Sequence, residues 1–385
     1  MLETSKTADV VVIGGGVIGL SIARALAQRG AVPMVVERST LGSESSTAAA
    51  GMLAPQAEAD SANEFFALCC RSRDLYPQFA AELLEETGVD VEFATAGTLY
   101  FAFDDEDVHE LEKRYRWQSE AGLTVSLLTG EEAQKLEPTI SADVKLALKF
   151  DFDTQVENRR LVNALAVANE RLNVSQLTGV DVRSLRASEN KIAGVETSEG
   201  FISTSRVVIA AGAWSSQLRV TPSDTGISLP ELRIEPVRGQ MLCFEANPQI
   251  LNHVVYSRRG YVVPRRDGRI LAGSTSEHVG FDKRVTAAGI QSISSAALQI
   301  CPQLATHSLT SSWAGLRPRA ADGLPVLGPC AEIDGVFYAT GHYRNGILLA
   351  PVTAELVAAA IVDGEVAHEL NTFSPNRFTL AEEVA

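Results

Sequence analysis

The stretch of residues 10–37 limits the possible fold more than any other part of the chain. Residues 10–13 are fully apolar, as in a buried parallel strand. Residues 20–29 repeat apolar side chains at helical spacing, and Gly30 follows as a typical helix C-terminal glycine. A second strand over residues 32–36 ends in an acid. A glycine-rich turn joins the first strand to the helix, so this order predicts a nucleotide-binding α/β unit.

Each residue of the turn Gly14-Gly15-Gly16-Val17-Ile18-Gly19 has a stereochemical reason. Gly14 makes the tight turn, Gly16 lets the backbone approach a pyrophosphate, and Gly19 lets the helix pack on the strand. The helix N-terminus supplies free amides and a positive dipole end for phosphates. Glu37 lies 21 residues after Gly16 and would accept hydrogen bonds from a ribose diol, which argues against NADP. We therefore predict a bound dinucleotide.

A second strand, turn and helix stand near the far end of the chain. Residues 335–340 contain a strand-like run, residues 341–346 form a turn, and residues 347–362 have helical spacing. The N-terminus of that helix could face the electron-rich pyrimidine end of a flavin. A strand within residues 206–214 also ends in small residues that permit close backbone approach. A simple NAD enzyme does not need further strand ends of small residues so far along the chain from the first turn. The pattern therefore favours FAD over NAD.

Three longer motifs are more specific. Residues 39–56 are rich in small and hydroxyl residues, which suit contact with phosphate and flavin, although their composition also fits a flexible surface loop. The chain resembles the glycine oxidases of thiamine biosynthesis in Ala49-Ala50-Gly51-Met52-Leu53-Ala54, Trp313-Ala314-Gly315-Leu316-Arg317-Pro318 and Gly341-His342-Tyr343-Arg344-Asn345-Gly346-Ile347-Leu348-Leu349-Ala350-Pro351. These enzymes are one branch of the D-amino-acid-oxidase-like FAD oxidoreductases. The resemblance runs from the first strand to about Val362.

The resemblance implies which residues hold the cofactor. Besides Gly14, Gly16 and Gly19, the implied FAD contacts are Val17, Ile18, Glu37, Arg38, Ser45, Ser46, Ala50, Gly51, Met52 and the backbone of Val180. The isoalloxazine ring would be held by His342, Tyr343, Arg344, Asn345, Gly346, Ile347 and Leu348. No cysteine stands close to Arg317 of the kind that tethers flavin in some sarcosine oxidases, so we expect non-covalent FAD. No metal site is expected.

Three residues match the family's substrate site. Arg317 and Arg344 match the substrate-binding arginines, and Tyr261 matches an active-site tyrosine. An arginine suits a carboxylate because its planar fork can donate two parallel hydrogen bonds. We expect Arg317 to lie between two strand-like runs. Taken singly, each arginine could instead form a surface salt bridge, and Tyr261 could be a half-buried strand residue.

The resemblance also implies the chemistry. Hydride would leave Cα of a small amino acid for the flavin, the imine would hydrolyse to an oxo acid and ammonia, and oxygen would be reduced to hydrogen peroxide. In thiamine biosynthesis the glycine imine would supply thiazole formation. His342 is a candidate base by position, but packing at the flavin edge is the favoured interpretation. Ser276 and Arg258-Arg259 depart from the family pattern of a methionine and a histidine, so sarcosine and small D-amino acids are also expected substrates.

The expected architecture is α/β (α+β overall), with a Rossmann-like FAD-binding domain and a second, antiparallel-sheet substrate domain. Because no linker rich in glycine or proline separates them, we expect the domains to interleave. The predicted FAD-binding domain takes residues 5–88, 145–228 and 314–366, and the substrate-binding domain takes 89–144 and 229–313.

Charge and cysteine content bound the partners. Of 385 residues, 33 are Lys or Arg and 48 are Asp or Glu, giving a net charge of −15. Such a chain is a poor ligand for nucleic acid or an anionic membrane. Residues 1–9 lack a basic signal-peptide region, and the five cysteines form no C-x-x-C, so we expect a cytoplasmic protein. A homo-oligomer is left open. The alternatives are a sarcosine oxidase, a D-amino acid dehydrogenase that reduces a quinone, and a non-catalytic flavin-binding module.

Overall fold

The computed structural model describes residues 6–221 and 228–378. Residues 1–5, part of the segment expected to lack a signal peptide, lie outside the described residues. So do residue 5 and residues 222–227 of the predicted FAD-binding domain.

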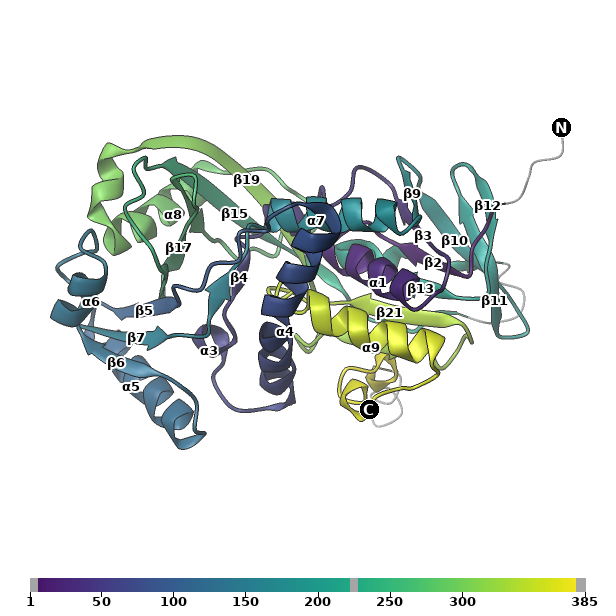
Figure 1. The fold of residues 1–385 in the computed structure, drawn as a ribbon, viewed down its shortest axis with the longest axis horizontal. Coiled ribbons are helices and arrows are strands. Elements are labelled where there is room, and N and C mark those ends of the chain that lie inside the picture. The colour runs from purple at the N-terminus through teal and green to yellow at the C-terminus, as the bar shows by residue number, and fades with distance from the viewer. Residues whose placement is uncertain (1–5, 222–227, 379–385) are drawn as a thin grey trace.

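A six-stranded sheet forms the centre of the nucleotide-binding half (Figure 1). Its strands, in spatial order, are β20 (Val326–Pro329), β21 (Val336–Thr340), β13 (Val207–Ile209), β2 (Val10–Ile13), β3 (Pro33–Glu37) and β9 (Ser175–Thr178). All neighbours pair in parallel except β20 and β21, which are antiparallel. Strands from three distant parts of the chain therefore meet here, and the predicted Rossmann-like unit is confirmed.

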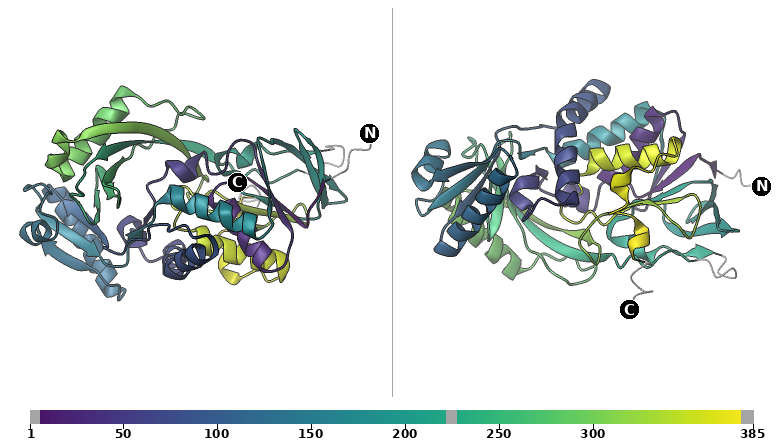
Figure 2. Two further views of the ribbon diagram at one scale, coloured as in Figure 1. Left: turned by 45° about the horizontal axis from the view of Figure 1, so that its top comes forward. Right: turned by 90° about the horizontal axis from the view of Figure 1, so that it is seen from below.

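Two layers cover this sheet because its strands are apolar on both faces. One face packs on α1 (Val17–Gln28), α4 (Glu64–Thr87), α7 (Asn158–Arg171) and α9 (Ala350–Val362). The other packs on a five-stranded sheet made of β1 (Lys6–Thr7), β12 (Gly200–Ser203), β11 (Lys191–Thr197), β10 (Val182–Ser188) and β14 (Val220–Thr221). Figure 2 shows these layers from two further directions.

An eight-stranded sheet makes the other half of the molecule. Its order is β19 (Ser308–Arg319), β15 (Glu235–Glu245), β18 (Arg269–Gly273), β17 (Gly260–Pro264), β16 (Val254–Ser257), β5 (Thr98–Ala102), β7 (Leu146–Phe150) and β6 (Ser126–Thr129). Neighbouring strands are antiparallel, as predicted, except for the parallel pair β16 and β5. Helices α5 (Asp105–Glu120), α6 (Gly130–Leu136) and α8 (Ala287–Ile300) pack against it.

Short elements connect the two halves. These are α2 (Ser45–Ala48), α3 (Pro55–Glu58) and the two-stranded pair β4 (Met52–Leu53) and β8 (Thr154–Gln155). The long strands β15 and β19 also run from the large sheet toward the nucleotide-binding half (Figure 1). The predicted division into two domains stays a prediction; strand β7, from the segment 145–228, joins the eight-stranded sheet.

One local prediction is wrong. Arg317 does not lie between two strands, because β19 continues through it for 12 residues and pairs with β15 along that length. Strand β19 is the edge of its sheet, where the missing N–H of Pro318 breaks no ladder on the open side. The edge position therefore allows the strand to carry Arg317 up to the nucleotide-binding half.

Among the residues that the structure describes, no helix has both the length and the apolar character required to cross a membrane. The five cysteines are all free thiols.

Candidate active site

A cavity of about 550 Å³ lies between the two halves, within the size range of small-molecule and cofactor sites. Every predicted site residue lines it except Gly19 and Leu348. A Cβ at Gly19 would lie 2.0 Å from the Gly14 carbonyl oxygen, so Gly19 serves helix packing. Leu348 is buried in the core, and its carbonyl accepts a hydrogen bond from Ser72 at 2.6 Å.

The nucleotide end is shaped by the turn between β2 and α1. Gly14 has a φ of 111°, and a Cβ there would lie 2.4 Å from the Ala210 carbonyl oxygen. Gly16 stands at the N-terminus of α1 without a side-chain cap, and a Cβ there would lie 3.1 Å from Ser46 Oγ. The glycines thus leave open a cradle that side chains would fill, as a pyrophosphate requires.

Glu37, at the end of β3, holds this cradle in shape. Its Oε2 accepts from the Gly15 amide at 2.8 Å and its Oε1 from the Ser39 amide at 2.9 Å. Each oxygen retains a lone pair for a further donor, since a carboxylate offers about four acceptor sites. Next to it, the Arg38 guanidinium stacks 3.7 Å over the ring of Trp214 and pairs with Glu44 at 3.1 Å.

The segment 45–52 forms the middle of the cavity and is largely fixed by the protein itself. Ser46 Oγ accepts from the Val17 amide at 2.9 Å, in the first turn of α1. Ser45 Oγ donates to the Leu316 carbonyl, which joins α2 to β19. Gly51 has a φ of 72°, and a Cβ there would lie 2.0 Å from the Val156 carbonyl oxygen. The predicted loop is therefore an ordered wall.

A buried arginine that the sequence analysis missed supports this wall. The guanidinium of Arg265 donates to the carbonyls of Ala50 (2.8 Å) and Val156 (3.1 Å) and to Gln155 Oε1 (2.7 Å). Burial lowers the pKa of Arg265 to about 10, so it still carries its charge at neutral pH. Nothing in its short-range pattern, Pro264-Arg265-Arg266, distinguished it from a surface arginine.

The turn after β21 forms another wall of the cavity. His342 is 3% exposed, and its Nε2 lies 3.1 Å from Thr353 Oγ1. Burial lowers the pKa of His342 to about 3, so the imidazole is neutral at physiological pH. A neutral, hydrogen-bonded and buried ring supports the packing interpretation over the role of a general base.

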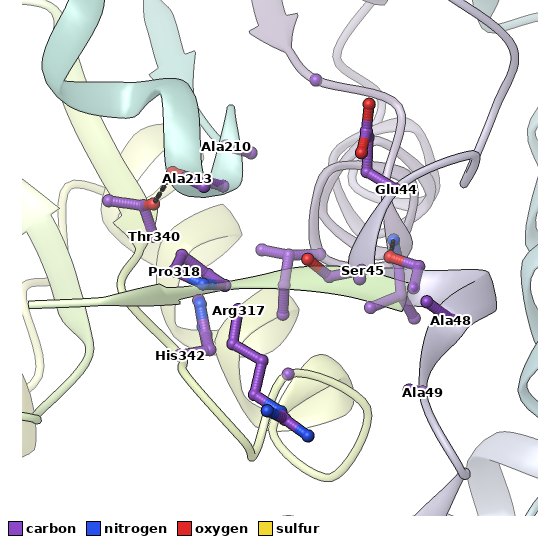
Figure 3. Close-up of a pocket in the computed structure, with 18 of the residues that line it drawn as sticks. Glu44, Ser45, Ala48, Ala49, Ala210, Ala213, Arg317, Pro318, Thr340 and His342 are labelled. Carbon is purple, nitrogen blue, oxygen red and sulfur yellow. Dashed lines mark hydrogen bonds between the residues drawn. The ribbon is translucent and has the colours of Figure 1, made fainter. Parts of the chain in front are cut away.

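Arg317 projects from β19 into the cavity, as Figure 3 shows. It donates to the Thr275 carbonyl at 3.0 Å and to Ser274 Oγ at 2.6 Å. Both acceptors are neutral, and no carboxylate of the described residues forms an ion pair with it. Its positive charge is therefore available for an anionic ligand.

Arg344 differs, because it already has an anion. Its Nε and Nη2 donate to Glu58 Oε1 at 3.2 and 2.8 Å, and Tyr256 Oη donates to the same oxygen at 2.9 Å. The Glu58 charge raises the pKa of Arg344 well above its usual value. Burial alone would raise the pKa of Glu58, but Arg344 and Tyr256 lower it below its usual range. This trio also lines a second cavity, of about 320 Å³.

Sequence reasoning missed Glu58 and Tyr256. The one available signal for Glu58 was an acid that closely follows the motif at residues 49–54. Tyr261, which was predicted, lies on β17 and donates weakly to Met241 Sδ at 3.4 Å. Because a thioether is a poor acceptor, this hydroxyl can turn to a better one at little cost.

The departures from the family pattern lie outside the large cavity. Arg258 and Arg259 line only the second cavity and pair with Glu106 and Asp104. Ser276 Oγ lies 3.3 Å from the hydroxyl of Tyr343, which does line the large cavity. Among the residues described, no cluster of His, Cys, Asp and Glu is arranged to hold a metal ion.

The geometry is that of a glycine-lined cradle joined to an arginine with neutral hydrogen-bond partners, and comparison with known proteins identifies the family of the chain. A family model described as FAD dependent oxidoreductase matches residues 9–360. The chain belongs to this family. It is therefore an FAD-dependent oxidoreductase, and FAD is its cofactor. The glycine cradle, the ordered wall at 45–52 and the cavity that joins them fit that cofactor.

Individual relatives agree over nearly the whole chain. A glycine oxidase of Geobacillus kaustophilus is 36% identical over 371 residues, which are 96% of this chain and 97% of that protein. A crystal structure of glycine oxidase from Geobacillus kaustophilus has a TM-score of 0.90 and 35% identity, covering 97% of this chain and 99% of that one. A bifunctional ThiO/ThiG protein of Trichormus variabilis is 37% identical over 97% of this chain but 55% of its own length. The predicted resemblance to glycine oxidase-like, FAD-dependent amino acid oxidases is confirmed.

Proposed function

We propose that the protein oxidises glycine and small D-amino acids to an oxo acid, ammonia and hydrogen peroxide, and sarcosine to the same oxo acid as glycine, with methylamine in place of ammonia. The observation that carries this proposal is Arg317, a cation with only neutral partners, placed in the same cavity as the FAD cradle. The named activity of the relatives supports it. FAD, when bound, accepts the hydride from Cα and passes the electrons to oxygen.

The chain's own residues hold the amino acid in place. Arg317 binds the carboxylate through two parallel hydrogen bonds. These bonds orient the amino acid in the cavity as well as increase its affinity. The Tyr261 hydroxyl turns from Met241 Sδ to a carboxylate oxygen. Arg344, already neutralised by Glu58, forms a polar wall of fixed shape. Of the two arginines predicted to bind the substrate, only Arg317 lacks an ion pair within the part of the chain that the structure describes, which favours small amines with one carboxylate.

Proton transfer needs no histidine in this arrangement. The substrate amine must lose a proton before hydride can leave, and His342 is too weak a base, with its Nε2 engaged by Thr353. We therefore propose that the amine binds in its neutral form. On this basis kcat/KM for glycine rises with pH toward the pKa of the substrate amine, without a step from His342 near neutral pH.

The relatives, rather than the residues of the site, support a metabolic role for the reaction. Similarity to bifunctional ThiO/ThiG proteins supports a role in supplying glycine imine for the thiazole of thiamine. No cysteine is found among the described residues that line the cavity, which supports non-covalent FAD. The cytoplasmic location and the oligomeric state stay predictions.

Anaerobic mixing with glycine, sarcosine and D-alanine, followed by air, tests the proposal. Bleaching of the flavin spectrum by glycine, then return of colour with peroxide, is the expected result. Bleaching that does not recover in air would identify a dehydrogenase with another acceptor. A flavin that only sarcosine reduces would identify a sarcosine oxidase, and one that none reduces would overturn the proposal in favour of a non-catalytic role.

A further inference from the structure

The guanidinium of Arg317 packs against the backbone of Gly239, where any side chain would collide with it. A Cβ added to Gly239, on β15, would lie 2.2 Å from Arg317 Nη1 and 2.3 Å from its Cζ. No such pair of atoms can coexist, so the guanidinium lies directly on the backbone of residue 239. This contact limits how closely the guanidinium approaches β15, but it does not fix the orientation of the guanidinium along the strand.

Two neutral acceptors set that direction. Ser274 Oγ and the Thr275 carbonyl oxygen accept from the two terminal nitrogens of Arg317, at 2.6 and 3.0 Å. Both belong to the irregular segment 274–286, between the end of β18 and the start of α8. Within the described chain, its sheet pairing is limited to a single antiparallel bridge between Glu277 and Arg238. Side-chain contacts must therefore hold the rest of the segment in place, and the direction of Arg317 depends on those contacts.

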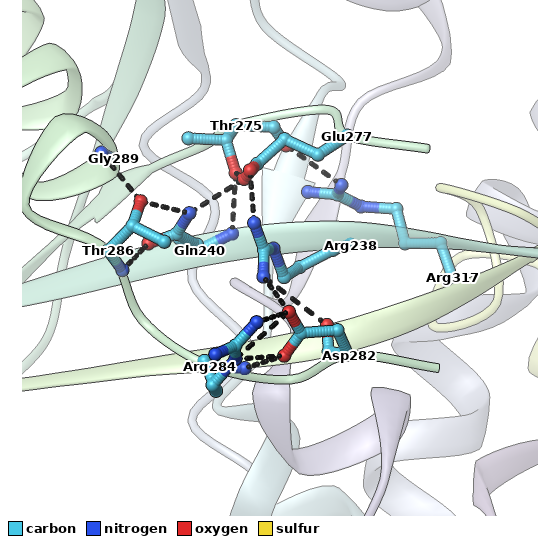
Figure 4. Close-up of polar contacts among 9 residues, drawn as sticks. All are labelled: Arg238, Gln240, Thr275, Glu277, Asp282, Arg284, Thr286, Gly289 and Arg317. Atoms are coloured by element: carbon cyan, nitrogen blue, oxygen red, sulfur yellow. Dashed lines mark hydrogen bonds and ion pairs between the residues drawn. The ribbon is translucent and has the colours of Figure 1, made fainter. Parts of the chain in front are cut away.

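Glu277 supplies most of them, as Figure 4 shows. Its Oε2 accepts from Arg238 Nη2 at 2.5 Å, and its Oε1 accepts from Gln240 Nε2 at 2.7 Å and from Thr275 Oγ1 at 2.5 Å. The backbones of Arg238 and Glu277 also exchange hydrogen bonds, at 2.9 and 3.0 Å. The carboxylate thus ties the residue that orients Arg317 to strand β15.

The far end of the segment is tied to the same two strand residues. Arg238 pairs with Asp282 at 3.3 Å, and Gln240 Oε1 accepts from the Thr286 amide at 2.8 Å, at the N-terminus of α8. Arg238 is 4% exposed, so removal of its anions would leave a poorly hydrated charge. The hydrogen bond from Arg238 lowers the pKa of Glu277 to about 2, so this acid is ionised throughout the working pH range.

We propose that Glu277 is a positioning residue for Arg317. It holds Ser274 and Thr275 against β15, and these neutral groups then aim the guanidinium at the substrate. A direct ion pair would aim Arg317 equally well but would neutralise it, as Glu58 neutralises Arg344. Because Glu277 acts on Arg317 through the neutral Thr275, it orients the guanidinium without neutralising its charge. This inference rests on the proposed function, in which Arg317 receives the substrate carboxylate.

The test compares Glu277→Gln with Glu235→Gln. Glu235 is the first residue of β15, pairs with Arg319 at 2.9 Å and lies 3.3 Å from His278 Nδ1 in the same segment. It lies outside the large cavity and forms no hydrogen bond with Ser274 or Thr275, so it is the control for loss of a carboxylate that touches the segment without holding the acceptors of Arg317. For each variant we would measure FAD content, kcat and KM for glycine, and the Ki of acetate, a carboxylate without an amine. In E277Q we expect KM and Ki to rise about tenfold, with FAD content and kcat near wild type. In E235Q all four values should stay unchanged.

A double variant separates positioning from a general structural role. If Glu277 acts through Arg317, E277Q causes no further rise in KM when Arg317 is already alanine. A second rise of the same size, or an E277Q enzyme that matches E235Q, would overturn the inference. An Arg317→Ala enzyme with normal KM would instead overturn the proposed function. If E277Q does not fold, Thr275→Val removes the hydroxyl between Gln240 and Glu277 and keeps the carbonyl, and the same cycle applies.

Discussion

The two ends of the cavity are built in different ways. At the nucleotide end, the turn around Gly14, Gly16 and Ser46 offers backbone groups and a neutral hydroxyl, and charged side chains such as Glu37 and Arg38 line the cavity beside it. At the substrate end, charged and phenolic side chains converge from separate elements, with Arg317 on β19 and the Glu58–Arg344 pair between α3 and the turn after β21.

The difference shows what each ligand demands. A pyrophosphate needs close approach and many amide donors, so backbone stereochemistry decides whether it binds. A small amino acid has little surface, so the balance of a few charges decides whether it binds. Changes at the two ends should therefore separate cofactor retention from substrate affinity.

The largest expected effect is at the nucleotide end. Gly14→Ala places a methyl group 2.4 Å from the Ala210 carbonyl, in a φ region that L-residues rarely adopt. We expect more than about a 100-fold loss of FAD affinity, or loss of the fold. Flavin content after gel filtration and the affinity of re-added FAD measure it. Gly364→Ala, also at positive φ but with open space around it, is the control. If the G14A protein retained FAD, backbone stereochemistry at the nucleotide end would not decide cofactor binding.

The next effect is at the substrate end. Arg317→Ala should raise KM for glycine about 100-fold, since two hydrogen bonds to a charged group are lost, while FAD stays bound. Arg319→Ala is the matched control, because it lies two residues along the same strand and pairs with Glu235 at the surface. Steady-state kinetics and the flavin spectrum give both readings. Loss of FAD from R317A would show that the two ends are not independent.

A smaller effect, in the direction of tighter anion binding, is expected at Glu58. Glu58→Gln leaves Arg344 without its anion, so acetate should bind about five- to tenfold more tightly. Inhibition of glycine oxidation by acetate measures this change, and FAD content is the internal control. Weaker acetate binding would mean that Glu58 shapes the pocket rather than balances its charge.

The smallest effect on catalysis is expected at Asp153, beneath the substrate end. This buried carboxylate accepts from the Gln56 and Ala57 amides, at 3.3 and 2.8 Å, and so supports α3 beside Glu58. Burial raises the pKa of Asp153 to about 7, whereas an unfolded aspartate titrates near ~3.9. Between these values the folded protein binds the extra proton, so its stability falls as pH rises through about 7.

Asp153→Asn should remove that dependence. Urea unfolding at pH 5, 6, 7 and 8 measures it, as experimental conditions spanning about that window. Wild type should lose up to about 1.4 kcal/mol per pH unit relative to D153N over the titration, with little change in kcat. Parallel pH profiles of the two proteins would show that Asp153 is ionised throughout.

The sequence by itself determined the nucleotide end. The strand, turn, helix and terminal acid are consecutive over residues 10–37, and each depends on local backbone geometry, so their order alone predicts their arrangement. The motifs around Arg317 and Arg344 also pointed to two arginines that line the cavity. They did not show that one is free and the other neutralised.

Only the tertiary structure decided that charge balance. Glu58 and Arg344 lie 286 positions apart in the chain, and Tyr256 lies 198 positions from Glu58. Glu277 meets Gln240 because β15 and the segment after β18 fold together, although 37 positions separate them. No local pattern encodes such contacts, because an acid and a base attract at short distance in space whatever their separation in sequence. The sequence thus determined the glycine-lined cradle of the nucleotide end, and the packing of distant elements decided which of the two arginines keeps an unpaired charge among the described residues.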